Sequence, residues 1–228
     1  MIDSNRTGVI DLHTHTFYSD GVLSPMEQAR RAVVNGYSAM GLTDHAGVGG
    51  VRQLLDLLRT DREIIERHWP IRVVVGVELT HVPAQAIHEA AAFARKAGAE
   101  IVVVHGETPV EPVPAGTNRA AIESGLVDIL AHPGMLTEEE AALAAQVGVY
   151  LEITARRGHS LTNGHVAALA RAHQAKVLVN SDAHEPSDLL TPSFQHRVGR
   201  GAGLSEQEVE RAVVAHPEAL LSVVLDRR

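Results

Sequence analysis

The chain alternates between short apolar runs and longer, more polar segments. Seven of the runs are β-branched and apolar nearly throughout, as strands buried on both faces of a sheet must be. These predicted strands are Val9–His13, Ala39–Thr43, Arg72–Glu78, Glu100–His105, Val127–Ala131, Val149–Thr154 and Lys176–Asn180. The segments between them predict helices at Pro25–Asn35, Val51–His68, Pro83–Ala97, Thr117–Ser124, Thr137–Gln146 and Asn163–His173. Strands that alternate with helices through short connections predict a parallel sheet.

Several helix ends carry local signals. Ser24 precedes Pro25, which places a capping side chain before a proline at the first helical position, and Thr137 and Glu140 have the spacing of a capping box. Glycines follow four of the helices, at Gly36, Gly98, Gly125 and Gly148. Beyond the seventh strand, we expect two terminal helices, Ser205–Ala215 and Pro217–Leu225, to pack on the outside.

Seven strands and a ring of helices favour an α/β fold of the distorted (β/α)7 barrel type. A full barrel of this kind typically needs ~250 residues, so 228 residues with 45% apolar content suit one domain, residues 1–228, about one unit short of eight. The alternative is an open, doubly wound sheet. Such a sheet would gather ligands only near its switch point and not from all the strands.

Composition excludes several classes of protein. The chain has no cysteine, so any metal must be held by imidazole and carboxylate. A formal net charge of -8 argues against a general nucleic-acid surface, although divalent cations could still admit a phosphorylated small molecule. The chain has no run of ~20 apolar residues, so the sequence predicts no membrane span. Residues 1–7 are short and polar and do not resemble a signal peptide, which leaves the cytoplasm as the default location.

Metal-ligand side chains follow the ends of these strands. The nine candidates are His13, His15, Asp20, His45, Glu78, His105, His132, Asp182 and His184. Strand carboxyl ends converge on one face of a closed parallel barrel, where active sites lie. The spacing of His13 and His15 puts both imidazoles on the same side of a strand, because side chains alternate with period two. The alternative is that these histidines cap strand ends or fill the barrel mouth.

Nine nitrogen and oxygen ligands exceed what one ion needs, since a catalytic ion takes about three protein ligands and leaves a position for water. The set therefore predicts two or three divalent ions, some sharing a carboxylate. Zinc, manganese and iron all suit such ligands.

These motifs closely resemble the PHP (polymerase and histidinol phosphatase) superfamily over nearly the whole chain. The matching segments, in the family's order, are Asp11-Leu12-His13-Thr14-His15 with Ser19-Asp20-Gly21, Leu42-Thr43-Asp44-His45, Gly76-Val77-Glu78, Val104-His105-Gly106, Leu130-Ala131-His132-Pro133 and Asn180-Ser181-Asp182-Ala183-His184. The resemblance implies a distorted barrel with a trinuclear centre. It assigns one ion to His13, His15, Glu78 and Asp182, a second to Glu78, His105 and His132, and a third to Asp20, His45 and His184. Asp20 stands where some members have histidine.

Other residues are candidates for binding substrate. Arg156, Arg157 and His159 follow the sixth strand, and arginine suits phosphate oxygens. A solvated ion pair and a helix-capping histidine are the alternative interpretations. Arg119, which opens a helix, could also reach a phosphate, and Glu152 could orient a ligand. The long loop of residues 106–116, which holds Glu107 and Glu111, could be a lid or specificity loop that meets a substrate amine; the alternative is a rigid connector.

The resemblance and the ligand set together predict a metal-dependent phosphomonoesterase, similar to histidinol-phosphate phosphatase, in which a metal-bridging hydroxide attacks phosphorus. Its partner would be a small phosphorylated substrate, without a membrane or general nucleic-acid surface. One alternative is a phosphodiesterase, exonuclease or amidohydrolase-like activity on the same centre. Another is a non-catalytic metal-binding regulatory module.

Overall fold

A computed structural model describes residues 8–228, so the interpretation of residues 1–7 lies outside the described part of the chain. The main strands form one parallel ladder in the order β1-β2-β4-β5-β6-β7-β8. Their bounds are β1 Val9–Thr14, β2 Tyr37–Leu42, β4 Arg72–Leu79, β5 Ile101–His105, β6 Ile129–Ala131, β7 Tyr150–Thr154 and β8 Val177–Asn180. This ladder confirms the predicted seven-stranded barrel. The structure adds β3 (His45–Ala46), whose two residues pair with the end of β4.

The barrel closes weakly between β8 and β1. A single parallel bridge joins Thr14 to Ala183, and the amide of Asp182 donates to the carbonyl of His13 at 3.0 Å. Lower in the barrel, the Asn180 side-chain oxygen replaces a backbone partner and accepts from the amide of Leu12. The barrel is therefore nearly closed, and its seam lies beside the first and last of the candidate ligands.

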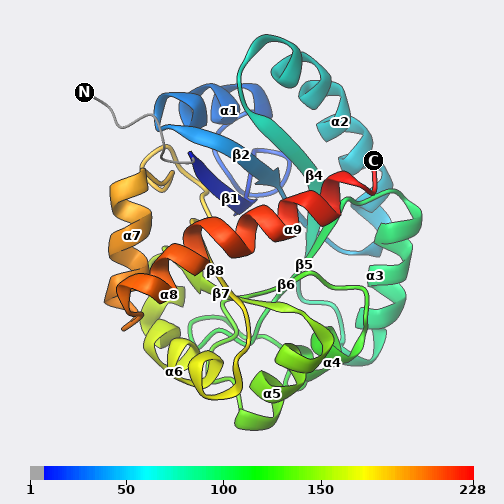
Figure 1. The fold of residues 1–228 in the computed structure, drawn as a ribbon. Helices are drawn as coiled ribbons and strands as arrows, with labels where there is room; N and C mark the ends of the chain where they lie inside the picture. The colour runs from blue at the N-terminus through cyan, green and yellow to red at the C-terminus, as the bar shows by residue number, and fades with distance from the viewer. Residues whose placement is uncertain (1–7) are drawn as a thin grey trace.

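Helices surround the strands (Figure 1). Those that lie between successive strands in the chain are α1 Pro25–Val34, α2 Val51–His68, α3 Ile87–Lys96, α4 Thr117–Glu123, α5 Glu138–Val147 and α6 Asn163–His173. The Ser24 cap and the Thr137–Glu140 capping box are both present, as predicted. Gly148 ends α5 with a φ of 84°, a left-handed conformation that glycine adopts without steric cost. Within residues 8–228, no helix combines the length and the apolar character needed to cross a bilayer.

The carboxyl-terminal region differs from the prediction. The pattern gave no helix at α7 (Pro192–Gly201), although Thr191 caps it and Pro192 opens it. The predicted helix at 205–215 divides into α8 (Glu206–Glu210) and a π-helical turn, Arg211–Ala215. The last helix, α9 (His216–Leu225), does not pack on the outside of the helix ring. It crosses the barrel opening, as Figure 1 shows, and its contacts are with β1, β4 and β8.

The physical reason for this placement is the apolar barrel interior. Leu220 and Val224 of α9 belong to one buried cluster with the inward-facing residues of the strands, namely Ile10, Leu12, Ala39, Val74, Ile101, Val103, Ile129, Ala131, Tyr150 and Leu178. Without α9, these side chains would meet water at the end of the barrel opposite the candidate ligands. Helix α9 therefore covers this end of the barrel and completes its apolar core.

We expect Leu220→Ala to lower the free energy of unfolding by about 2–5 kcal/mol, because it removes a buried leucine and leaves a cavity at the end of the barrel. Val223→Ala is the matched control, since Val223 lies on the same helix with 51% exposure and should change stability little. Urea unfolding followed by circular dichroism measures both. Equal stability of the two variants would show that α9 does not seal the barrel.

Candidate metal centre

The nine candidate side chains converge at one mouth of the barrel, at the carboxyl ends of the strands. The Nε2 atoms of His13 and His15 lie 3.0 Å apart, as expected for alternate residues on one face. Potential ligand atoms come within 4.8 Å of one another in overlapping groups, which include His13 with His15 and Glu78, and Glu78 with His105 and His132. The geometry therefore places all three residues assigned to the second ion together.

Glu78, at the end of β4, lies in the middle of the cluster and is fully buried. Its Oε1 lies 3.4 Å from Nε2 of His13 and 3.6 Å from Nε2 of His132. Its Oε2 lies 3.7 Å from Nε2 of His15 and 2.5 Å from Nδ1 of His45. One carboxylate thus faces imidazoles that are assigned to all three ions, as a bridging ligand would.

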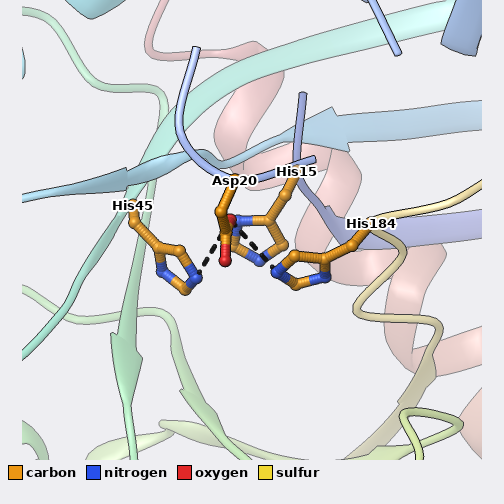
Figure 2. Close-up of side chains that lie close together, drawn as sticks. All are labelled: His15, Asp20, His45 and His184. Atoms are coloured by element: carbon orange, nitrogen blue, oxygen red, sulfur yellow. Dashed lines mark ion pairs between the residues drawn. The ribbon is translucent and has the colours of Figure 1, made fainter. Parts of the chain in front are cut away.

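Asp20 organises the outer group. Figure 2 shows its carboxylate between His45 and His184, with His15 beside them. Asp20 Oδ1 lies 3.2 Å from Nε2 of His184 and 3.5 Å from Nε2 of His45. His15 therefore lies close to the candidate ligands of the third ion (Asp20, His45 and His184) as well as to those of the first ion.

Asp44, the residue before His45, fixes the turn that carries Asp20. Its buried carboxylate accepts from the amide of Thr16 at 2.7 Å and from the hydroxyl of Ser19 at 2.9 Å. This tie holds the segment after β1 against the segment after β2, so that Asp20 and His45 meet. Asp44 acts on the site through these contacts, as expected for a carboxylate that supports ligands.

Glu152 of β7 supports the inner group. Its Oε1 accepts from Nδ1 of His13 at 2.8 Å and from the Asn180 amide group at 3.0 Å, and its Oε2 accepts from the backbone amide of His132 at 3.1 Å. The hydrogen bond to Nδ1 leaves Nε2 of His13 directed at Glu78 and Asp182. Glu152 thus holds His13 in one tautomer and orientation, as a carboxylate behind a metal-binding histidine does.

Two candidate ligands have left-handed backbones. Asp182 has a φ of 53° and His132 a φ of 27°, in a region that residues other than glycine seldom adopt. His132 directly follows β6 and Asp182 lies two residues after β8, where the chain must turn a side chain into the mouth. Such strain is typical of functional sites, where the surrounding structure holds it in place.

The hydrogen-bonding pattern fits bound cations. Nδ1 of His105 and Nδ1 of His184 each lie against a backbone carbonyl, of Gly106 at 3.2 Å and of Asp182 at 2.9 Å. A carbonyl only accepts, so Nδ1 of each ring carries a proton and Nε2 is the nitrogen turned toward the mouth. Those Nε2 atoms face carboxylates, of Glu111 and Asp20. Glu78 Oε1 and the Nδ1 atoms of His15 and His132 are buried and have no hydrogen-bond partner among residues 8–228. A cation beside Glu78 would satisfy its Oε1, and imidazole with carboxylate suits zinc, manganese or iron.

The electrostatics point the same way. Burial disfavours charge on His45, but Glu78 and Asp20 outweigh it and raise the pKa of His45 to about 10. Burial, together with the like charges of Glu78 and Glu152 and against the attraction of His13, raises the pKa of Asp182 to about 7. Burial also raises the pKa of Glu78, yet His45 and His13 lower it well below its usual range. Protons therefore balance the carboxylates in the absence of metal ions.

The residues predicted to bind substrate differ in how close they lie to the mouth of the barrel. His159 is buried, and its ring stacks on His132 with centroids 4.3 Å apart. Arg156 pairs with Asp188 at 2.9 Å, and the same Asp188 oxygen accepts from the amide of His184, so Arg156 is tied to the rim of the mouth. Arg157 is exposed, and Arg119 pairs with Glu123 on the exposed face of α4.

Thr80 and Thr108 contact the site but were not among the predicted residues, and Glu111 was expected to meet a substrate amine, not a histidine of the site. Thr80 lies 2.7 Å from Nδ1 of His45, and Thr108 lies 2.8 Å from Nδ1 of His159. Glu111, from the loop of residues 106–116, lies 3.1 Å from Nε2 of His105. Thr80 follows Glu78 by two residues, so the period of a strand could have indicated it. The two loop residues follow no periodic pattern.

The chain belongs to the PHP family, a family of metal-dependent hydrolases; the model of the PHP domain matches residues 11–105. It is 47% identical over 212 residues to MJ1295, an uncharacterized protein of Methanocaldococcus jannaschii, which covers 92% of this chain and 97% of that protein. It is 27% identical over 202 residues to ribonuclease P protein component 3 of Methanosarcina barkeri, with 82% and 78% covered. A Caldanaerobacter subterraneus protein named as a probable phosphatase is 28% identical over 193 residues, with 77% and 76% covered.

The fold has counterparts among solved structures. The crystal structure of hisK from Listeria monocytogenes, assigned as a histidinol phosphatase, matches with a TM-score of 0.59 at 11% sequence identity. The match covers 81% of this chain and 98% of that chain. At this level of identity the likeness concerns the fold alone, and it agrees with the barrel described above.

Proposed function

We propose that this protein is a metal-dependent phosphomonoesterase whose nine converging side chains hold two or three divalent ions. The observation that carries the proposal is the set of imidazole Nε2 atoms that face carboxylates across the barrel mouth, above all around Glu78. His13, His15, Glu78 and Asp182 would hold one ion, Glu78, His105 and His132 a second, and Asp20, His45 and His184 a third. Bound there, the ions would supply Lewis acidity and lower the pKa of a water molecule to ~7.

The residues of the chain would then bind and orient the ester. Arg156, which is tied to the rim through Asp188, can turn a guanidinium toward a phosphate oxygen with charge-assisted hydrogen bonds. His159 stands against His132 at the wall of the mouth, where an N–H could be donated to the phosphate or to the leaving oxygen. Glu152 and Asp44 keep the ligand side chains in place. Arg156 and His159 are better placed for these roles than Arg157.

A panel of substrates tests the reaction class. Protein loaded with manganese, zinc or iron should hydrolyse small phosphate monoesters in preference to phosphodiesters, short RNA and amides. The relative named as a ribonuclease P component makes RNA a necessary arm of this panel. Preferential cleavage of a diester, RNA or an amide would replace the proposed reaction with that activity. No turnover of any substrate by fully loaded protein would favour a regulatory module.

We expect Arg156→Ala to lower kcat and kcat/KM together by roughly 10–100-fold on the best monoester, because a charge-assisted contact to a charged group contributes about 1.5–3 kcal/mol. Metal content should stay unchanged, which separates this effect from loss of a ligand. Arg31→Ala is the matched control, since Arg31 forms an exposed pair with Glu27 on α1. If Arg156→Ala and Arg157→Ala both keep full kcat/KM at normal metal content, this segment does not bind the phosphate.

A further inference from the structure

The loop between β5 and α4 brings one carboxylate into the mouth of the site. Glu111 Oε2 lies 3.1 Å from Nε2 of His105, and its Oε1 lies 3.4 Å from Nε2 of His159. A third imidazole, His81, lies 3.8 Å from the same Oε2. Glu111 is exposed, so it reaches these rings from the solvent side.

Hydrogen bonds at the base of this loop and contacts nearer its tip hold the loop in position. Glu107 and Asn118 exchange hydrogen bonds between side chain and backbone, at 2.9 and 3.0 Å, and the Asn118 amide group also donates to the carbonyl of Pro133. Gly134 packs so closely under the carbonyl of Glu107 that a Cβ there would collide with it. Nearer the tip, Thr108 bonds to Nδ1 of His159, and Val110 lies over Gly158. Prolines at 109, 112 and 114 stiffen the segment between.

The contact between Glu111 and His105 has the geometry of two side chains that share one ion. Nδ1 of His105 lies against the carbonyl of Gly106, which leaves Nε2 as the nitrogen that faces the Glu111 carboxylate at 3.1 Å. Ligand atoms that share one ion at bond lengths of about 2.1 Å lie roughly 3.0–3.5 Å apart. The distance between Glu111 and His105 has this value, and His105 is one of the candidate ligands of the second ion.

We propose that Glu111 is itself a metal-binding side chain, a displaceable tenth ligand that occupies the position beside His105 and yields it to the anionic group of a substrate. The proposal rests on the metal centre proposed above. A free carboxylate and a phosphate cannot both take this position, so Glu111 competes with phosphate. The Glu111 side chain is exposed and can turn toward solvent without movement of the loop, whose base Glu107 and Asn118 keep fixed.

Metal affinity and phosphate affinity test this proposal separately. Metal-free wild-type protein and Glu111→Gln are titrated with Mn²⁺ or Zn²⁺ against a chelating dye, and inorganic phosphate is then titrated into the loaded proteins by calorimetry. Glu111→Gln should bind at least one ion about tenfold more weakly or worse, on the scale of losing a group that supports a metal ligand. Once loaded, it should bind phosphate more tightly than the wild type.

Two further variants separate ligation from charge. Glu111→Asp keeps the charge but shortens the reach, so it should weaken metal binding as Glu111→Gln does. Glu185→Gln removes an exposed charge directly after His184 and should leave both affinities unchanged. Wild-type metal and phosphate affinities in Glu111→Gln would overturn the inference while leaving the proposed function intact. A wild-type protein that binds no metal would overturn both.

Discussion

Glu78→Gln is expected to remove metal and activity together. A neutral amide bridges two ions poorly, and the two oxygens of Glu78 face His13 and His132 on one side and His15 and His45 on the other. We expect the metal content to fall by at least one ion per chain. We expect kcat/KM to fall by roughly a thousandfold or more, the equivalent of about 4 kcal/mol of lost charge stabilisation. Elemental analysis and monoester hydrolysis on the same sample measure both.

The matched control is Glu100→Gln. Glu100 is also a buried glutamate beside a strand of the barrel, but it pairs with Arg62 and Arg228 and accepts from the amide of Val75, away from the imidazole cluster. Its replacement should lower stability and leave metal content at the wild-type value. Full metal content and activity in Glu78→Gln would refute the bridging role.

The second large effect is expected for Glu152→Gln. The amide oxygen of glutamine can accept two hydrogen bonds, but the amide nitrogen only donates, so glutamine cannot accept from Nδ1 of His13, from Asn180 and from the amide of His132 together as the carboxylate does. One of the three donors therefore loses its partner, and the fixed orientation of His13 and His132 is weakened. Metal affinity should fall about 10–100-fold, as is typical when the partner of a metal-binding histidine is removed.

The distinguishing measurement for Glu152→Gln is activity as a function of metal concentration. Because Glu152 acts through His13, excess metal should restore much of the activity, whereas it should not restore Glu78→Gln. Loss of activity at saturating metal with unchanged metal affinity would instead place Glu152 in contact with the substrate. Circular dichroism spectra that match the wild type would exclude a folding defect.

The fold could be predicted largely from the sequence because parallel strands buried on both faces read as continuous apolar runs. The convergence of the candidate side chains followed from one rule, that the carboxyl ends of such strands meet at one mouth. The placement of α9 could not be predicted in this way. An apolar pattern shows that Leu220 and Val224 are buried, yet it does not show which surface covers them. β3, with two residues, is too short to produce a pattern.

The finer structure of the site depends on contacts between distant segments. His15 lies near Asp20 and His45 because Asp44 ties the segments after β1 and β2 together, and near His184 because its own amide bonds to the carbonyl of Ala183. Glu111 reaches His105 from a loop whose sequence has no periodicity, so only the folded chain reveals the contact. The missed helix α7 is different, since Thr191 and Pro192 form a helix-start signal that was present in the sequence.

The most direct test of the account is an anomalous-difference map from crystals of the wild-type protein grown with Mn²⁺ and inorganic phosphate. The account predicts two or three peaks among the nine side chains, with Glu78 in contact with two of them and a phosphate against the ions. A map with no peak in this cluster, or with a single peak that Glu78 does not touch, would contradict it.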